Sequence, residues 1–224
     1  MPTTWVGLLR GVNVGGNTIT SADLVAAIRD AGFSRVKAVL ASGNVLVEDG
    51  DVDDGHDTAG GAANGNGNGN DGDEGAGTNT TTGVGGPSAG LPRRRAEVRR
   101  RLEAAIDARY GYGVAVAVVG HDELQAVIGA YPFEEVADRH PYVTFATDPA
   151  LIAALAEDAA QLLTGTSAVG SERLAVGDGV VYWEVAKGSS TDSPFAKICS
   201  RARYRTGAEV ITTRNLRTLR KLVW

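Results

Sequence analysis

The chain of 224 residues has little of what secreted or membrane-spanning proteins need. It contains one cysteine, so no disulfide can form within it. No run of apolar residues approaches the roughly 20 that are needed to cross a bilayer. Its first residues lack the basic stretch and apolar core of a secretory signal. We therefore expect a soluble, cytoplasmic protein that does not associate with membranes.

The residue spacings of common catalytic and metal sites are also missing. His56, His121 and His140 do not stand at the spacings that bind metal ions. Cys199 falls on an apolar helix face, which indicates a buried thiol and not a nucleophile. We therefore expect no metal and no cofactor, and the sequence identifies no catalytic residue. Chemistry by acids and serines that the fold brings together stays open.

Lysine and arginine are absent from one long segment, residues 49–92. This segment contains eight acidic residues and 14 of the 30 glycines. The rest of the chain keeps all 22 lysines and arginines against 19 acidic residues, so it is mildly basic although the whole chain carries −5. The segment has few apolar side chains to bury, and its glycines would lose much backbone entropy on ordering. It predicts a disordered Gly/Asn/Asp-rich insertion.

The remaining residues show the same order of elements twice. In residues 1–48 and 93–119, strands are predicted at 4–10, 36–40, 44–48 and 114–119, with helices after Thr20 and around 98–106. In residues 141–224, strands are predicted at 142–147, 172–176, 180–186 and 209–211, with helices from Pro149, Pro194 and Thr213. Residues 120–140 form a connection with a short helix. The pattern predicts an α+β fold of two ferredoxin-like βαββαβ halves that arose by internal duplication.

Several sequence blocks are similar to a known bacterial family. These blocks are Arg10-Gly11-Val12-Asn13-Val14-Gly15-Gly16, Ser42-Gly43-Asn44-Val45, Tyr131-Pro132-Phe133, Ser193-Pro194-Phe195-Ala196-Lys197 and Thr212-Thr213-Arg214-Asn215. They resemble the family known as domain of unknown function 1697. The chain departs from the family at Asn17 and Thr18, where a lysine is usual, and at Leu216, where a tryptophan is usual. The resemblance implies a bacterial protein of that fold and implies no activity.

The first candidate site is the glycine-rich loop after the first strand. Such a loop before a helix can point backbone N–H groups at an anion, and we expect Gly11, Asn13, Gly15 and Gly16 to do so. The loop resembles a phosphate-binding loop that lacks its lysine, so nucleotide hydrolysis is not expected. Arg10 stands beside it and can bind a phosphate or carboxylate with two hydrogen bonds. Glycines that only shape a connection, and an ion pair of Arg10 with a structural acid, are the alternatives.

The second candidate site is a set of basic residues near the C-terminus. Lys197, Arg201 and Arg205 stand four residues apart, which predicts one basic stripe along a helix. Such a stripe attracts phosphate groups, although it can equally be a solvated helix face. The block Thr212–Asn215 is predicted at a junction between strand and helix. There Thr213 would be the N-cap, and Arg214 and Asn215 would be free to contact a ligand.

The leading functional hypothesis is a non-catalytic protein that binds a phosphorylated or otherwise anionic ligand, either a small molecule or a nucleic acid. The residues expected to converge on it are Arg10, Gly11, Asn13, Gly15, Gly16, Ser42, Asn44, Lys197, Arg201, Thr213, Arg214 and Asn215. An enzyme that acts on a small anionic metabolite in the groove between the halves is one alternative. A protein-interaction module without a ligand is another. The sequence determines neither the ligand nor the oligomeric state.

Overall fold

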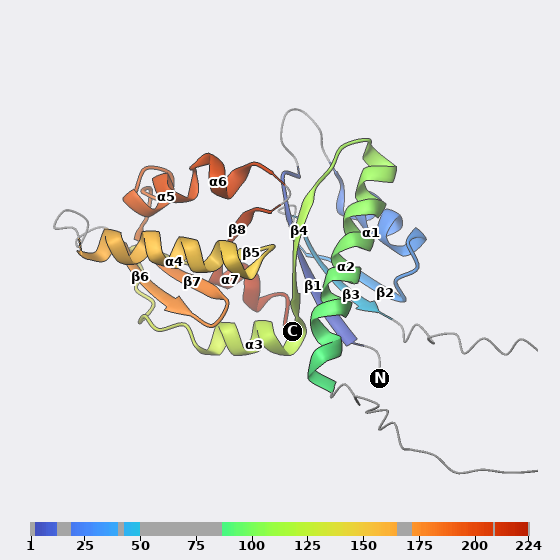
Figure 1. Cartoon of the computed structure of the whole chain (residues 1–224), viewed down its shortest axis with the longest axis horizontal. Coiled ribbons are helices and arrows are strands. Elements are labelled where there is room, and N and C mark those ends of the chain that lie inside the picture. The colour runs from blue at the N-terminus through green and yellow to red at the C-terminus, as the bar shows by residue number, and fades with distance from the viewer. Residues whose placement is uncertain are drawn as a thin grey trace, which may run out of the picture.

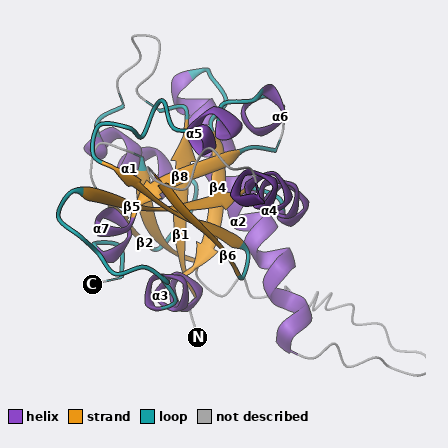
Figure 2. Ribbon diagram, turned by 90° about the vertical axis from the view of Figure 1, so that its left-hand side faces the viewer, coloured by secondary structure: helices purple, strands orange, loops and turns teal. Residues whose placement is uncertain are grey.

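The computed structural model describes residues 3–12, 19–39, 43–49, 87–164, 172–207 and 209–223. Within these ranges the chain is an α+β protein with two four-stranded antiparallel sheets and seven helices (Figures 1 and 2). Most of the insertion predicted over 49–92 lies outside the described residues. None of the helices in these ranges combines the length and apolarity needed to cross a bilayer.

The first sheet and two helices make up the first half. Its strands are β1 (Thr3–Arg10), β2 (Arg35–Ala38), β3 (Asn44–Asp49) and β4 (Ala115–Gly120), in the order β2-β3-β1-β4. The helices α1 (Ser21–Asp30) and α2 (Pro87–Tyr110) pack on one face of this sheet. Val98, Leu102 and Ile106 of α2 are fully buried there, as their helical spacing predicts.

Short-range signals fix where the helices of the first half begin and end. The hydroxyl of Thr20 accepts a hydrogen bond of 3.1 Å from the backbone N–H of Asp23, so Thr20 caps α1 as predicted. Gly32 follows the helix with φ +86°, a conformation that favours glycine. Helix α2 begins at Pro87, inside the segment that the sequence assigned to the insertion. Proline is well placed there because the first helical N–H needs no partner.

Gly43 makes the turn into β3 against the end of β1. Its φ is +70°, and a Cβ atom at this position would lie 2.4 Å from Cγ2 of Val12. Its carbonyl oxygen accepts a hydrogen bond of 2.8 Å from the N–H of Leu9. Glycine therefore allows the backbone to come close to β1, where the candidate site lies.

The second sheet forms the core of the second half. Its strands are β5 (Arg139–Ala146), β6 (Glu172–Gly177), β7 (Val180–Ala186) and β8 (Ile211–Asn215), in the order β6-β7-β5-β8. One face packs against α4 (Pro149–Thr164), α5 (Pro194–Cys199) and α6 (Ala202–Arg205). Asp148 and Ser193 cap α4 and α5 by accepting hydrogen bonds of 2.7 Å from the N–H of Ala150 and 3.2 Å from the N–H of Ala196.

The last strand and helix lie further along the chain than predicted. The sequence placed a strand at 209–211 and a helix from Thr213, whereas β8 continues to Asn215 and α7 spans Leu216–Arg220. The hydroxyl groups of Thr213 and Thr144 are 2.9 Å apart across the β5–β8 pair. Strand pairing thus keeps Thr213 extended, and the prediction that it is an N-cap is wrong. Asn215 is the N-cap of α7.

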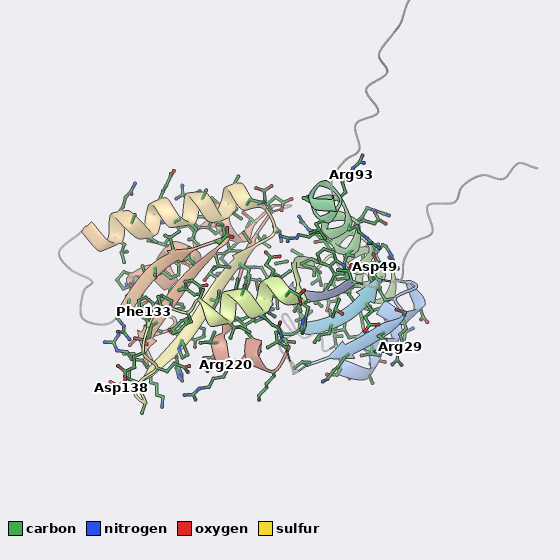
Figure 3. The ribbon with its side chains drawn as sticks, turned by 90° about the horizontal axis from the view of Figure 1, so that it is seen from below. Arg29, Asp49, Arg93, Phe133, Asp138 and Arg220 are labelled. Carbon is green, nitrogen blue, oxygen red and sulfur yellow. The ribbon has the colours of Figure 1, made fainter. Side chains whose placement is uncertain are left out.

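The two halves meet through the faces of their sheets that the outer helices leave uncovered. Val6 and Leu8 of β1 and Val143 and Phe145 of β5 belong to one buried apolar cluster. The helix α3 (His121–Gly129), which joins the halves, and α7 add side chains to it, among them Leu124 and Leu216. Figure 3 shows side chains filling the space between the halves. This shared core holds β1 of the first half and β5 of the second half against each other, and with them the residues of the candidate site.

Candidate functional site

Arg10 lies where the two halves meet. Side chains alternate along β1, so Val6, Leu8 and Arg10 share the face that turns toward the second half. The half-buried Arg10 guanidinium donates a hydrogen bond to the backbone carbonyl oxygen of Ile211 in β8. A residue at the end of the first strand therefore reaches the last strand of the chain, some 200 residues later.

Arg214 reaches across the same junction in the opposite direction. Its Nε donates to Oδ1 of Asn44 at 2.7 Å, and its Nη1 donates to Oγ1 of Thr212 at 2.6 Å. Its Nη2 donates to the carbonyl oxygen of Leu9. Asn44 is held by its own bond of 3.1 Å from Nδ2 to the carbonyl oxygen of Val39. The structure thus brings together three predicted site residues, Arg10, Asn44 and Arg214.

Burial and neighbouring positive charges lower the pKa values of the arginines at this junction. Burial first, and then the charge of Arg10, lower the pKa of Arg214 to about 10. Burial and the charge of Arg205 in turn lower the pKa of Arg10 from its ordinary value. Two positive charges that repel each other where little water reaches them are stabilised by a negative charge nearby. The electrostatics of the junction therefore favour an anion.

A cavity of about 670 Å³ opens beside Arg10 and Arg205, between the halves. Its volume is within the range of small-molecule sites, about 300–1,000 Å³. The lining includes Arg10, Gly11, Arg99, Glu103, Asp107 and Arg205. Among the described residues, neither Arg10 nor Arg205 forms an ion pair with a carboxylate. The cavity thus has two guanidinium groups from different halves that can bind an acidic ligand.

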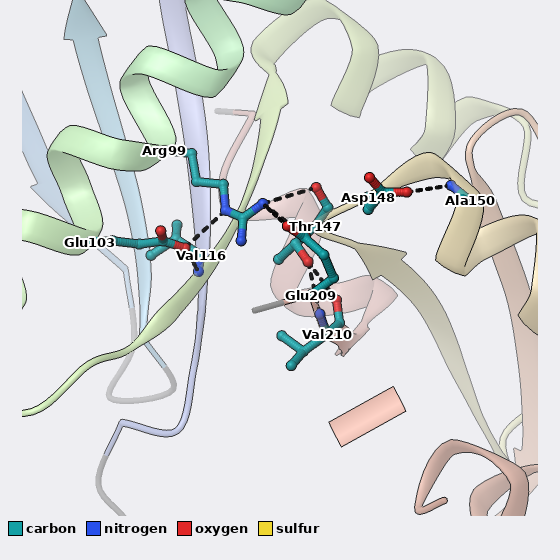
Figure 4. A network of polar contacts seen from close by, with 8 residues as sticks. All are labelled: Arg99, Glu103, Val116, Thr147, Asp148, Ala150, Glu209 and Val210. Atoms are coloured by element: carbon teal, nitrogen blue, oxygen red, sulfur yellow. Dashed lines mark hydrogen bonds and ion pairs between the residues drawn. The ribbon is translucent and has the colours of Figure 1, made fainter. Parts of the chain in front are cut away.

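A polar network beside the cavity ties α2 to the second half (Figure 4). Nε of Arg99 donates to Glu103 at 2.9 Å, and Nη1 donates to Glu209 at 2.9 Å and to the carbonyl oxygen of Thr147 at 3.3 Å. Glu103 also accepts a bond of 3.0 Å from the N–H of Val116. The four-residue spacing of Arg99 and Glu103 is typical of an ion pair along one helix. No sequence signal indicated Glu209.

The predicted basic stripe along one helix is wrong. Helix α5 ends at Cys199, and α6 begins only at Ala202. The hydroxyl of Ser200 donates a bond of 2.8 Å to the carbonyl oxygen of Lys197, which caps this break. Arg201 does not line the cavity and instead pairs with Asp158 of α4 at 2.9 Å. Of the three basic residues in the stripe, only Arg205 lines the cavity.

The remaining predicted site residues do not line this cavity or cannot be placed. Asn13, Gly15, Gly16 and Ser42 lie outside the described residues. Lys197 is exposed, Thr213 bonds to Thr144, and Asn215 accepts a bond of 2.9 Å from the N–H of Arg217. Within the described ranges, no group of three His, Cys, Asp or Glu side chains is placed to hold a metal ion.

Asp158 joins α4 to α6 and should make stability depend on pH. Burial raises its pKa, but the hydrogen bonds from Arg203 and Tyr204, with the charges of Arg203 and Arg201, outweigh burial and hold the pKa below its ordinary value. A lowered native pKa stabilises the fold above the unfolded pKa, and the effect is lost as pH falls through the native pKa. Asp158→Asn should thus lower the free energy of unfolding by about 1 kcal/mol at pH 7, because solvent screens the half-exposed arginines.

Urea unfolding of both proteins at neutral and acidic pH tests this prediction. The difference between Asp158→Asn and the wild type should begin to shrink below about pH 4, where the aspartate of the unfolded chain becomes protonated, and it should be lost as the pH falls through the lower native pKa. An equal difference at both pH values would show that the ion pairs of Asp158 contribute nothing. Glu157→Gln is the matched control, because Glu157 is exposed on the same helix.

Comparisons with known proteins place the chain by family and by fold. A family model described as protein of unknown function (DUF1697) matches residues 2–59 and 91–182. The conserved bacterial protein SP0830 from Streptococcus pneumoniae has a similar solved structure. Its TM-score is 0.61 at 16% identity, covering 100% of this chain and 97% of that chain. At this identity the likeness shows the fold alone. A comparison with curated proteins gave no match.

The family match confirms the resemblance that the sequence blocks predicted. It includes the blocks at Arg10–Gly16, Ser42–Val45 and Tyr131–Phe133, and it passes over the middle of the acidic insertion. The two blocks after residue 182 lie beyond it. The matched residues are more than half of the chain, which therefore belongs to the DUF1697 family of proteins of unknown function.

Proposed function

We propose that this protein binds a small phosphorylated or carboxylated molecule in the cavity between its halves. The observation that supports this most is the meeting of Arg10 and Arg205, from different halves, at one cavity of about 670 Å³. Guanidinium groups bind phosphates and carboxylates through paired, charge-assisted hydrogen bonds. An anion between them would also relieve their mutual repulsion.

The surface charges favour a small ligand over a nucleic acid. A nucleic acid binds through many cationic side chains that neutralise successive phosphates. Much of the basic charge in the described residues is already paired with acids. The pairs are Arg95–Glu123, Arg100–Glu97, Arg201–Asp158, Arg203–Asp158 and Arg220–Glu135. Arg10 and Arg205 have no such acid among the described residues, and both line the cavity.

An enzyme acting on a small anionic metabolite is the second candidate. Glu103 and Asp107 line the same cavity as Arg10, one helical turn apart on α2. Glu103 is engaged by Arg99 and by the N–H of Val116, whereas Asp107 is exposed. A ligand held by Arg10 would lie within the same cavity as a carboxylate that can exchange protons. This observation supports proton transfer as the type of reaction to test.

We also propose that the two halves of the protein arose by duplication of a ferredoxin-like unit. In each half the elements follow the order βαββαβ, and the second half has an additional short helix before its last strand. The strand orders β2-β3-β1-β4 and β6-β7-β5-β8 are equivalent. The repeated order supports two copies of one unit, with the ligand cavity at the junction that the duplication created.

Binding of pyrophosphate and citrate to the full chain tests the proposed function. A ligand that binds only the native state raises the melting temperature, and at 100 times Kd it adds about 2.7 kcal/mol of stability. Arg10→Ala and Arg205→Ala should each weaken binding about 10- to 100-fold, because each removes charge-assisted bonds worth about 1.5–3 kcal/mol. Calorimetric titration gives the Kd of each variant.

Arg201→Ala is the control for these variants, since Arg201 pairs with Asp158 and does not line the cavity. It should leave the binding of pyrophosphate and citrate unchanged. If both anions fail to bind, or bind equally well after Arg10→Ala, the proposed site is wrong. If labelled single-stranded DNA instead binds with a steep salt dependence and is weakened by Arg201→Ala, the nucleic-acid alternative replaces it.

A further inference from the structure

One acid on the wall of the cavity beside Arg10 has no partner in the described chain. Asp107 lies near the end of α2, lines the cavity and is exposed. Its carboxylate forms no ion pair and no hydrogen bond with another described residue. A charged group that lines a cavity and has no other contact can bind a ligand there.

The neighbours of Asp107 along α2 do not explain its charge. Ion pairs along a helix join residues three or four positions apart. The positions at these distances from Asp107 hold Glu103, Ala104, Tyr110 and Gly111, none of which is a lysine or an arginine. Glu103 is itself an acid, and two acids four residues apart destabilise a helix slightly. Asp107 therefore does not serve to pair charges within its own helix.

The other charges that line the cavity are of two kinds. Two of its arginines are already balanced by acids. These pairs are Arg99 with Glu103 and Glu209 (Figure 4), and Arg100 with Glu97. Arg10 and Arg205 have no such acid among the described residues. Together with Asp107, they leave the cavity with unbalanced charges of both signs, which a ligand that also carries both signs would complement.

Asp107 lies close enough to Arg10 for one small molecule to contact both. Arg10 lies at the end of β1, which pairs with β4, and neighbouring strands are about 4.8 Å apart. Residues 113–115, which lead from α2 into β4, line the same cavity. Glu103, one helical turn before Asp107, accepts a bond of 3.0 Å from the N–H of Val116 in β4. This side of α2 therefore lies along the strand next to Arg10.

Asp107 opposes the binding of a plain anion in this cavity. A phosphate or carboxylate between Arg10 and Arg205 would share the cavity with a like charge, and like charges repel. A protonated amine on the ligand would reverse the sign of this contact, because an ammonium group donates charge-assisted hydrogen bonds to a carboxylate. The charges of the cavity thus favour a ligand with an acidic group at one end and an amine at the other.

We propose that the ligand of this cavity is a small molecule that carries a protonated amine as well as its acidic group. The acidic group lies between Arg10 and Arg205, and the amine donates to the carboxylate of Asp107. Phosphate esters of amino alcohols and amino acids with a second acidic group share this chemistry. The proposal rests on the function proposed above, because it concerns the same cavity.

Calorimetric titration of the full chain with two matched pairs of probes tests the proposal. Phosphoethanolamine is compared with monoethyl phosphate, and aspartate with succinate, in a buffer free of divalent cations. In each pair the first compound adds an amine to the second. In at least one pair the compound with the amine should bind about three- to fivefold more tightly, as expected for a solvent-exposed ion pair. The pair that shows this preference distinguishes a phosphorylated amine from an acidic amino acid.

Substitutions of Asp107 show whether the preference comes from this carboxylate. In Asp107→Asn the amine would meet only the cations of the cavity, so the preference should reverse, a change of about tenfold in the ratio of the two Kd values. Asp107→Glu keeps the charge and should keep the preference. Asp30→Asn is the matched control, because Asp30 is exposed at the end of α1 and does not line this cavity. It should leave both Kd values unchanged.

The outcomes distinguish this inference from the proposed function. If monoethyl phosphate or succinate binds and is weakened by Arg10→Ala, but the amine adds no affinity in either pair, the inference is wrong and the anion site stands. The same holds if the preference for the amine survives Asp107→Asn. If no compound of either pair binds, the proposed function itself is wrong, and this inference falls with it.

Discussion

Replacing Arg214 by methionine is expected to lower the free energy of unfolding by about 3–5 kcal/mol. The guanidinium donates to Asn44, Thr212 and the carbonyl oxygen of Leu9. Methionine keeps much of the apolar stem but donates no hydrogen bond. Acceptors from both halves would then lose their donor at the junction. Each buried polar group that loses its partner costs about 1–3 kcal/mol.

The charge of Arg214 works against this stabilisation. Burial and then Arg10 lower its native pKa to about 10, well below the ordinary value of a free arginine. Because the unfolded chain binds this proton more tightly, the charge destabilises the native state at neutral pH, and the penalty fades as pH rises above about 10. The hydrogen bonds must outweigh that penalty. Arg214→Lys keeps a charge with fewer and differently placed donors, so it should recover little of the loss.

Guanidinium chloride unfolding followed by circular dichroism measures the effect. The control is Arg217→Met, because Arg217 is exposed on α7. It should change stability by less than about 0.5 kcal/mol. If Arg214→Met falls within the same range, the apolar cluster around Leu8 and Phe145 holds the halves together without help from Arg214.

The elements that the sequence predicted well are those set by neighbouring residues. Thr20 and Ser193 cap their helices through residues three positions along the chain. Gly179, with φ +66°, turns the β6–β7 hairpin within a few residues. The burial of α2 follows from the helical spacing of its own side chains. Such signals predicted the order of the strands in both halves, and that of the helices in the first half, without knowledge of the fold.

The features that the sequence missed depend on partners far along the chain. The end of β8 is set by pairing with β5, about 70 residues earlier, which overrides the helical pattern after Thr213. Arg205 was predicted to belong to a stripe with Arg201, and the break between α5 and α6 separates the two. Arg10 was identified from its place beside a glycine-rich loop. That it meets Arg205 and Arg214 follows only from how the halves pack.

Glu172→Ala is expected to lower the free energy of unfolding by about 3 kcal/mol. Glu172 is 4% exposed and accepts two hydrogen bonds of 2.9 Å, from Nε1 of Trp183 and from the N–H of Phe195. One carboxylate therefore joins β6 to β7 and to the first turn of α5. Its removal leaves two buried donors without an acceptor, and each contributes to the loss.

Two further variants make the measurement specific. Glu172→Gln keeps a carbonyl acceptor without the charge, so it should lose about half as much, since bonds to charged acceptors are the stronger ones. Glu157→Ala is the control for removing an acid, because Glu157 is exposed on α4 and should change stability by less than about 0.5 kcal/mol. Urea unfolding at neutral pH compares all three with the wild type.

The result for Glu172 can be compared with the state of Trp5. Glu172→Ala would leave the indole N–H of Trp183 in the state in which the described residues leave that of Trp5, buried and without an acceptor. A loss near 3 kcal/mol would show that an unsatisfied indole is costly in the second half of this chain. A loss below about 1 kcal/mol would show that a buried indole without an acceptor is tolerated there, as it is at Trp5.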